Sequence, residues 1–303
     1  MKRPIRRLGI VALAGLLCLA ISGADASSAR GDADDAAPKQ SKNGAGCRTA
    51  EPVGRFHPAE DLLIANFDNK PDTDDLLAAA GLTTMLRDER LACVRYVAAT
   101  GTYGNNPGSF IDATSLFNLA FGRAWADAHA DRPAAVAFLA KHALKTLRRG
   151  GDVWIMEAGQ SDVTAAVARR IAEKAPAVDM RSRVHLVQHS EVNEYLTTPA
   201  ALAYVRDHLD YIKIANGNEV GNGTPGFKTF GGTAWPALLA DPESGKVWAK
   251  ARRLALEFNP TSAYPNEAIA AGGLDFSDLV EAAYVFGFED LVDVEDFASE
   301  FAP

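Results

Sequence analysis

The chain has 303 residues, of which 48% are hydrophobic and 23% are charged, and its formal net charge is −8. This composition excludes a disordered or fibrous protein, and about 300 residues can bury a large core as one α/β domain or two smaller ones. The excess of acidic residues argues against nucleic acid as the main partner, because a surface that neutralises phosphates needs clustered Lys and Arg.

Residues 1–26 have the pattern of a secretory signal peptide. A basic start is followed by an apolar run from Leu8 to Ser22, and Ala24-Asp25-Ala26 provides an A-x-A cleavage signal, so cleavage is expected after Ala26. The alternative is an uncleaved anchor, but this run is short for a membrane span, which needs about 20 residues. No later stretch of the sequence is apolar enough to cross a membrane. We therefore expect a secreted or periplasmic protein.

Residues 27–54 are rich in Ser, Ala, Gly, Asp and Lys and have no apolar period, which predicts a flexible tether. The folded domain is then expected over residues 55–303. Removing the signal peptide would leave Cys47 and Cys93 as the remaining cysteines. In an oxidising compartment they can form a disulfide, and the alternative is a pair of free thiols.

From Leu62 onward, segments with the apolar pattern of strands alternate with segments that have helical spacing. Strands are expected at Leu62–Phe67, Val94–Ala99, Asp152–Glu157, Arg183–Gln188 and Tyr211–Ala215. Helices are expected at Thr73–Glu89, Phe110–Ala130, Pro133–Arg149, Ser161–Lys174 (with Ser161 as N-cap), Pro199–His208, Lys246–Glu257 and Ser277–Phe286. Residues 216–235 are expected to form a long loop, and the acidic segment Glu289–Glu300 a solvated helix face. This alternation predicts an α/β fold, a mostly parallel open sheet of Rossmann-like type with helices on both faces.

The loop after the first predicted strand contains four carboxylates within eight residues: Asp68, Asp72, Asp74 and Asp75. One or two acidic residues at a helix start serve as caps and suit the helix dipole, but four exceed that need. Packed together they would repel one another unless they bind a cation or share a proton. Hard oxygen ligands at this density suit Ca²⁺ or Mg²⁺. The alternative is a solvated acidic helix start.

Polar residues also follow the other predicted strands. In open parallel sheets ligands bind at the carboxyl ends of the strands, so these loops are expected to open on one pocket. The candidates are Asn105 and Asn106 after the second strand, Glu157 to Asp162 after the third, His189 to Glu194 after the fourth, and Asp275 and Asp278 near the C-terminus. His189 is a candidate general acid or, alternatively, a core residue.

As an ordered set, from Leu62 to Phe286, these motifs resemble the nucleoside hydrolase superfamily of the inosine-uridine preferring type, and in particular its divergent secreted bacterial members. The resemblance implies one Ca²⁺ at the bottom of the pocket. It implies as metal ligands Asp75, Asp278 (with Asp275 as the poorer match) and the backbone carbonyl of Ala158. It implies as sugar-binding residues Asp74, Asn105 or Asn106, Glu191 and Asn193.

The acidic loop departs from the family motif D-x-D-P-G-x-D-D. The second aspartate of that motif binds calcium and accepts a proton from the attacking water, but Lys70 occupies its register here. Either Asp68 or Asp72 takes the catalytic role in a shifted loop, or the site no longer performs this chemistry. Ser277 stands where the family usually has a histidine.

These observations predict a hydrolase acting on glycosyl compounds, which cleaves the N-glycosidic bond of a nucleoside or related glycoside with Ca²⁺ outside the cytoplasm. One alternative is a non-catalytic sugar- or nucleoside-binding protein on the same fold, which Lys70 favours. Another is a hydrolase of cell-wall or polysaccharide fragments, which export would suit. The expected partner is a small molecule. We expect no nucleic-acid partner and no membrane span after signal cleavage, and the sequence is compatible with a homo-oligomer.

Overall fold

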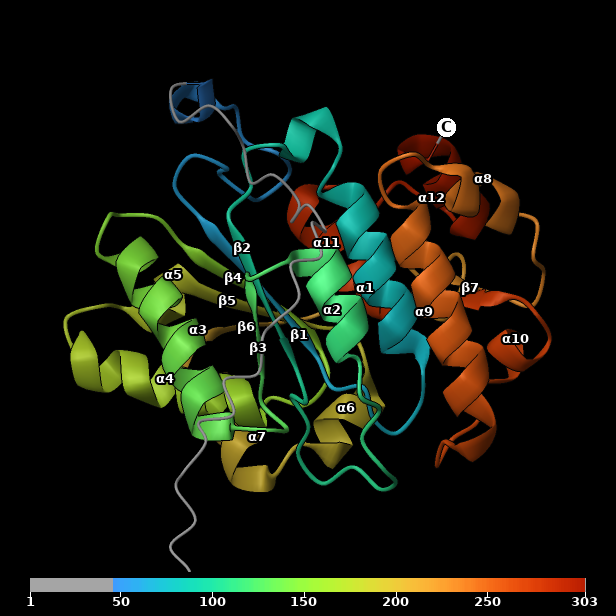
Figure 1. Ribbon diagram of the computed structural model, residues 1–303. Helices are drawn as coiled ribbons and strands as arrows, with labels where there is room; N and C mark the ends of the chain where they lie inside the picture. Colours follow the sequence, from blue (N-terminus) through green and yellow to red (C-terminus); the bar gives the residue numbers. More distant parts are fainter. Residues whose placement is uncertain (1–45, 303) are drawn as a thin grey trace, which may run out of the picture. The chain divides into compact units, whose positions relative to one another are not determined.

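A computed structural model describes residues 46–302 of the chain. These residues form an α/β domain around a six-stranded parallel sheet in the order β3-β2-β1-β4-β5-β6 (Figure 1). The strands are β1 (Leu62–Phe67), β2 (Tyr96–Thr100), β3 (Trp125–Asp127), β4 (Val153–Ala158), β5 (Val184–Gln188) and β6 (Asp210–Lys213). The predicted fold class is confirmed.

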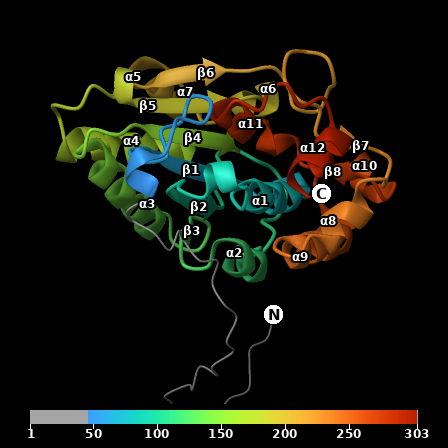
Figure 2. The same cartoon turned by 90° about the horizontal axis from the view of Figure 1, so that it is seen from above.

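Helices cover both faces of the sheet (Figure 2). One face carries α3 (Arg132–Leu147), α4 (Asp162–Lys174) and α7 (Pro199–His208); the other carries α1 (Asp74–Met85), α2 (Thr114–Phe121), α9 (Gly245–Phe258) and α11 (Val280–Phe286). Strand β1 is buried along its whole length. Leu63 and Phe67 pack into the core on the face that α1 covers, and Leu62 and Ile64 pack into the core on the face that α3 covers. Burial on both faces explains why this strand is a continuous apolar run instead of an alternating one.

The C-terminal third packs onto the outside of α1. Trp248 of α9 is fully buried there, and its indole donates a hydrogen bond of 2.8 Å to the hydroxyl of Thr84. The other elements are α5 (Met180–Arg183), α6 (Glu191–Leu196), α8 (Trp235–Ala240), α10 (Glu267–Ala270), α12 (Val294–Phe301), the antiparallel pair β7 (Lys228–Thr229) and β8 (Leu274–Asp275), and the 3₁₀ turns η1 (Gly46–Thr49), η2 (Glu89–Leu91), η3 (Asn259–Thr261) and η4 (Ser277–Leu279). Helix α12 lies in the predicted solvated segment, but its apolar side is buried through Phe297 and Phe301.

Two local expectations were wrong, and a third was met in part. The predicted helix at 110–130 ends at Phe121, where Gly122 takes φ +59°, and the chain then forms the edge strand β3. A strand of three residues is too short to show a period in the sequence. Helix α6 replaces part of an expected loop because the Ser190 side chain accepts hydrogen bonds from the first-turn amides. Ser161 occupies the N-cap position of α4, but its side chain makes no capping hydrogen bond.

The sheet has a topological switch point between β1 and β4. The chain runs from β1 outward to β2 and β3, and then returns to place β4 on the other side of β1, with Phe67 paired to Ala158. The loops after these two strands turn to opposite faces of the sheet, which leaves a crevice at their carboxyl ends. The acidic loop follows β1 directly and therefore begins at this point.

The predicted signal peptide and residues 27–45 of the predicted tether lie outside the described residues. From Gly46 on, the predicted tether is attached to the domain. A disulfide joins Cys47 to Cys93 with a Cα–Cα distance of 5.3 Å, and Val53 forms a β-bridge with Phe56. Among residues 46–302, no helix combines the length and apolarity needed to cross a bilayer.

Candidate functional site

The loop between β1 and α1 folds back on itself through backbone hydrogen bonds to its own carboxylates. The amide of Lys70 donates to Asp68 Oδ1 at 2.9 Å, and the amide of Asn69 donates to Asp75 Oδ2 at 2.5 Å. Asn69 has φ +50°, a left-handed conformation that asparagine tolerates better than most residues. The turn places Asp74 and Asp75 in the first turn of α1, at the switch point.

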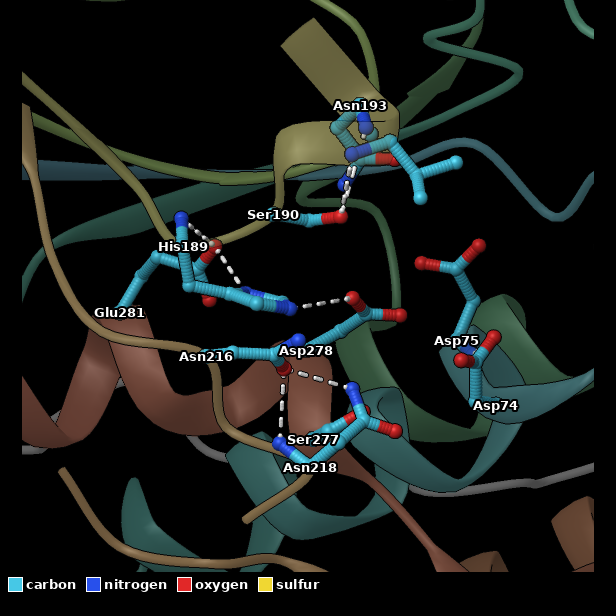
Figure 3. Close-up of polar contacts among 12 residues, drawn as sticks. Asp74, Asp75, His189, Ser190, Asn193, Asn216, Asn218, Ser277, Asp278 and Glu281 are labelled. Carbon is cyan, nitrogen blue, oxygen red and sulfur yellow. Dashed lines mark hydrogen bonds and ion pairs between the residues drawn. The ribbon is translucent and has the colours of Figure 1, made fainter. Parts of the chain in front are cut away.

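Three carboxyl groups converge at this point. Asp74 and Asp75 of α1 and Asp278 of η4 each offer an oxygen, and these oxygens lie within 4.8 Å of one another (Figure 3). Asp75 is 1% exposed and Asp278 7% exposed. In the part of the chain that the structure describes, this is the one group of three or more Asp, Glu, His or Cys side chains so arranged.

The three carboxyl groups form a donor set that fits a divalent cation. Asp75 Oδ1 is buried and has no hydrogen-bond partner among the described residues. A buried carboxylate oxygen without a partner is costly, and a cation would supply the missing interaction. Carboxylate oxygens are the preferred ligands of Ca²⁺ and Mg²⁺. Asp74, Asp75 and Asp278 are therefore the candidate metal ligands.

Burial and the charges of neighbouring carboxyl groups raise the pKa of the acidic residues around this centre. Burial first, and then the neighbouring charge of Asp68, raises the pKa of Asp75 well above its ordinary value. Burial followed by the charge of Asp72 does the same for Asp74. Burial and then the Asp74 charge likewise raise the pKa of Asp278.

These pKa shifts predict how stability depends on pH. The folded, metal-free protein binds more protons than the unfolded chain, because the pKa of Asp72 rises from 3.8 to about 7 through burial and the charge of Asp68. The free energy of unfolding should therefore fall as pH rises through this window, by roughly 1–3 kcal/mol in total. Urea unfolding of metal-stripped protein at pH 5 and pH 7.5 measures this difference. Asp72→Asn should flatten it, because it removes the titrating group; a metal-free protein that gains stability over the same range would contradict the raised pKa of Asp72.

Asp68 joins three loops at the sheet edge. It is 4% exposed, and its Oδ2 accepts hydrogen bonds from Asn106 Nδ2 at 2.9 Å and Gln160 Nε2 at 2.8 Å. Gln160 also donates to Asn193 Oδ1 at 3.0 Å. The loops after β2 and β4 thus meet on this carboxylate, whose two oxygens both accept hydrogen bonds, and Gln160 extends the network to Asn193 of α6.

Asp72, the other candidate for the catalytic role, has fewer interactions. Its side chain is only partly buried, and its hydrogen-bonded side-chain neighbour is Asp74. It lies beside the candidate metal ligands without being enclosed as Asp68 is. Asp72 is therefore the more accessible of the two carboxyl groups.

The ammonium group of Lys70 points to an aromatic ring. Its Nζ lies 4.5 Å from the centroid of the Tyr103 ring, and it forms no ion pair with a carboxylate of the described residues. The backbone carbonyl of Lys70 accepts a hydrogen bond from Asn106 Nδ2 at 2.5 Å. The backbone of Lys70 therefore takes part in the hydrogen bonds of the acidic loop, while a cation–π contact with Tyr103 stabilises its ammonium group.

The structure does not bring all the predicted residues to the centre. Asn105 is exposed, whereas Asn106 is buried against Asp68. The Glu191 side chain is 75% exposed and lies 3.6 Å from the ammonium group of Lys213. Ala158 is buried at the end of β4, where it pairs with Phe67 next to the switch point.

The glycine after Ala158 allows the close approach of β4 to the acidic loop. A Cβ atom on Gly159 would lie 2.8 Å from Asp68 Cβ and 3.1 Å from the carbonyl oxygen of Thr102. Any larger residue would push the loop after β4 away from the loops after β1 and β2. The strand–glycine–helix junction is thus required for packing at the switch point.

Asp275, the poorer sequence match for a metal ligand, is fully engaged elsewhere. Its carboxylate is buried and accepts from Asn266 Nδ2 and Ser277 Oγ, each at 2.8 Å, and from Lys228 Nζ at 3.0 Å. These three donors satisfy its oxygens. Asp278 remains the aspartate of this segment that faces the centre.

Glu281 went unrecognised in the sequence, and Gln160 was expected only as one residue of the polar loop after the third predicted strand. Glu281 Oε1 lies 2.7 Å from His189 Nδ1, and His189 Nε2 lies 3.7 Å from Asp278 Oδ1. Burial lowers the pKa of His189, but the charge and hydrogen bond of Glu281 outweigh this and raise it overall. The spacing of Asp278 and Glu281, three residues apart at the start of a helix, was the available signal, because it places both on one face.

Comparison with known proteins finds no family model, no curated protein and no solved structure that matches this chain. The function is therefore argued from the geometry of the site.

Proposed function

We propose that the protein is a calcium-dependent hydrolase that cleaves the N-glycosidic bond of a nucleoside or a related glycoside outside the cytoplasm. The observation that carries this proposal is the convergence of Asp74, Asp75 and Asp278 at the switch point, with an unpartnered buried oxygen on Asp75. The ordered resemblance to the nucleoside hydrolase superfamily supports it. The signal-peptide pattern of residues 1–26 supports the location.

The proposed mechanism divides the acidic loop into two functions. Asp74, Asp75 and Asp278 would hold Ca²⁺, with the carbonyl of Ala158 as a further ligand. When bound, Ca²⁺ supplies positive charge that makes a nearby water more acidic. Asp72 would accept the proton of the attacking water, whose oxygen forms the new bond to the anomeric carbon. The N-glycosidic bond breaks at the same time, and the leaving base takes its electron pair and gains a proton from solvent.

The remaining residues would hold and stabilise the sugar. Breaking the N-glycosidic bond leaves positive charge on the sugar ring in the transition state, which neighbouring carboxylates stabilise. Asn193 and Asn106 present amide groups at the same sheet edge for sugar hydroxyls, although both now bond to residues of the Asp68 network. Glu191 of α6 and Asn105 are exposed, and would contact the sugar only after a movement of these segments toward the centre.

A second candidate function is sugar or nucleoside binding without catalysis. Lys70 favours it, because a lysine stands where the family motif has its proton acceptor and because Asp68 has both oxygens engaged. Under this alternative Asp72 has no catalytic role. A panel of nucleosides and nitrophenyl glycosides separates the two functions: turnover supports the hydrolase, and saturable binding without turnover supports the binding protein.

Cation binding itself is tested by thermal unfolding of the purified protein in calcium and in chelator. Calcium at 100 times its dissociation constant should add about 2.7 kcal/mol to the free energy of unfolding, a rise in Tm of several degrees. The rise should vanish in Asp75→Ala, and it should persist in Asp290→Asn, a matched loss of charge at an exposed position. An unchanged Tm of the folded wild-type protein would rule out the calcium site.

A further inference from the structure

A buried acid–imidazole pair lies directly behind the candidate metal centre. Glu281 of α11 is 0% exposed and His189, which follows β5, is 2% exposed. Glu281 Oε1 faces both the backbone amide of His189, at 3.3 Å, and its ring Nδ1, at 2.7 Å. Figure 3 shows Glu281, the His189 ring and Asp278 in a row, with the ring between the two carboxyl groups. The proposed mechanism uses neither Glu281 nor His189.

Glu281 fixes the orientation of the imidazole ring. The carboxylate is an acceptor on both contacts, so Nδ1 carries a hydrogen and the ring presents Nε2 to Asp278. Among the described residues Asp278 receives no side-chain hydrogen bond, and the basic side-chain nitrogen that lies within 4.0 Å of its carboxyl group is His189 Nε2, at 3.7 Å. The orientation of the Asp278 carboxyl group thus depends on this ring.

The pair is costly for the fold. Glu281 Oε2 is buried and has no hydrogen-bond partner among the described residues. A buried carboxylate with an unpartnered oxygen destabilises a protein, and apolar replacements of buried charged groups are often neutral or stabilising. Packing alone therefore does not account for a glutamate at this position. A role in holding the metal ligand does.

We propose that Glu281 is a positioning residue that acts through His189 to orient the Asp278 carboxyl group, and thereby sets the affinity of the three-aspartate centre for a divalent cation. Outer partners that hold metal ligands in place typically contribute about 10- to 100-fold to metal affinity. The inference rests on the proposed function, because it requires that the centre binds a cation.

The test compares Glu281→Leu with Glu281→Gln in the full protein. Isothermal titration with CaCl₂ should show an affinity about 10- to 100-fold lower for Glu281→Leu, because leucine cannot accept the hydrogen bond from Nδ1. Glu281→Gln keeps an acceptor oxygen and should keep an affinity close to that of the wild type. In chelator, Glu281→Leu should unfold at the wild-type temperature or above it. If leucine disturbs the packing, Glu281→Met, which matches the length of glutamate more closely, provides the same comparison.

A purely structural role predicts the opposite pattern. Glu281→Leu would then lower the Tm in chelator and leave the calcium affinity unchanged, which overturns the positioning role while the calcium site stands. Absence of calcium binding by the folded wild type would overturn the proposed function, and this inference with it. Loss of affinity in Glu281→Gln equal to that in Glu281→Leu would show that the hydrogen bond to His189 is not the cause.

Discussion

Replacing Asp72 with asparagine is expected to lower kcat about 100- to 10,000-fold, the usual range for losing a general base. An amide cannot accept the proton of the attacking water, but it retains the size of the carboxyl group. Since Asp72 is only partly buried and outside the three-aspartate centre, the calcium-induced rise in Tm should remain. Steady-state kinetics on the best substrate of the glycoside panel, together with thermal unfolding in calcium, measure both effects.

Asp68→Asn is the matched control, because it makes the same chemical change in the same loop. Both Asp68 oxygens accept hydrogen bonds, so an amide there places a donor against the donors of Lys70, Asn106 or Gln160. This conflict should cost about 1–3 kcal/mol of stability. A variant Asp68→Asn that keeps its stability and loses activity, beside an active Asp72→Asn, would assign the base to Asp68.

Removing the disulfide by Cys47→Ser with Cys93→Ser should lower the free energy of unfolding by about 4 kcal/mol. The bond links residues 46 positions apart and so closes a loop that includes β1 and α1. Without it the unfolded chain gains conformational freedom that the folded chain does not. Urea unfolding, read as the midpoint concentration and slope, gives the difference.

A reducing agent supplies the control for this measurement. It should move the wild-type midpoint to that of the double variant and leave the variant itself unchanged. Equal midpoints of oxidised wild type and variant would mean that the link does not stabilise the fold. Calcium binding should survive the substitution, because neither cysteine belongs to the three-aspartate centre.

The sequence predicted best those features that depend on neighbours along the chain. Strand β1 has the predicted bounds, because burial on both faces makes it a continuous apolar run between polar loops. The acidic loop was recognisable because its four carboxylates exceed what a helix start requires. The expectation that Asp278 shares a ligand role with Asp75 came from the resemblance, since nothing local to Asp278 indicates where its helix packs.

The features that the sequence did not predict depend on contacts between residues that are far apart along the chain. Strand β3 is held by its neighbour β2 and has too few residues for a pattern of its own. The direction of the Lys70 side chain depends on Tyr103, which comes from another loop. The unequal burial of Asp68 and Asp72 likewise depends on Gln160 and Asn106, which other strands deliver to the site. Contacts of this kind are set by tertiary packing and leave no trace in local spacing.

The residues of the candidate metal centre are far apart along the chain and are therefore synthesised at different times. Asp74 and Asp75 leave the ribosome about 200 residues before Asp278, and α11, which carries Glu281, follows later still. A nascent chain that ends before Asp278 lacks one of the three carboxylates, whatever it has already folded. A cation held at native affinity would therefore mark chains whose C-terminal third has docked on α1. Calcium would then stabilise only those chains in which the C-terminal third has folded onto α1.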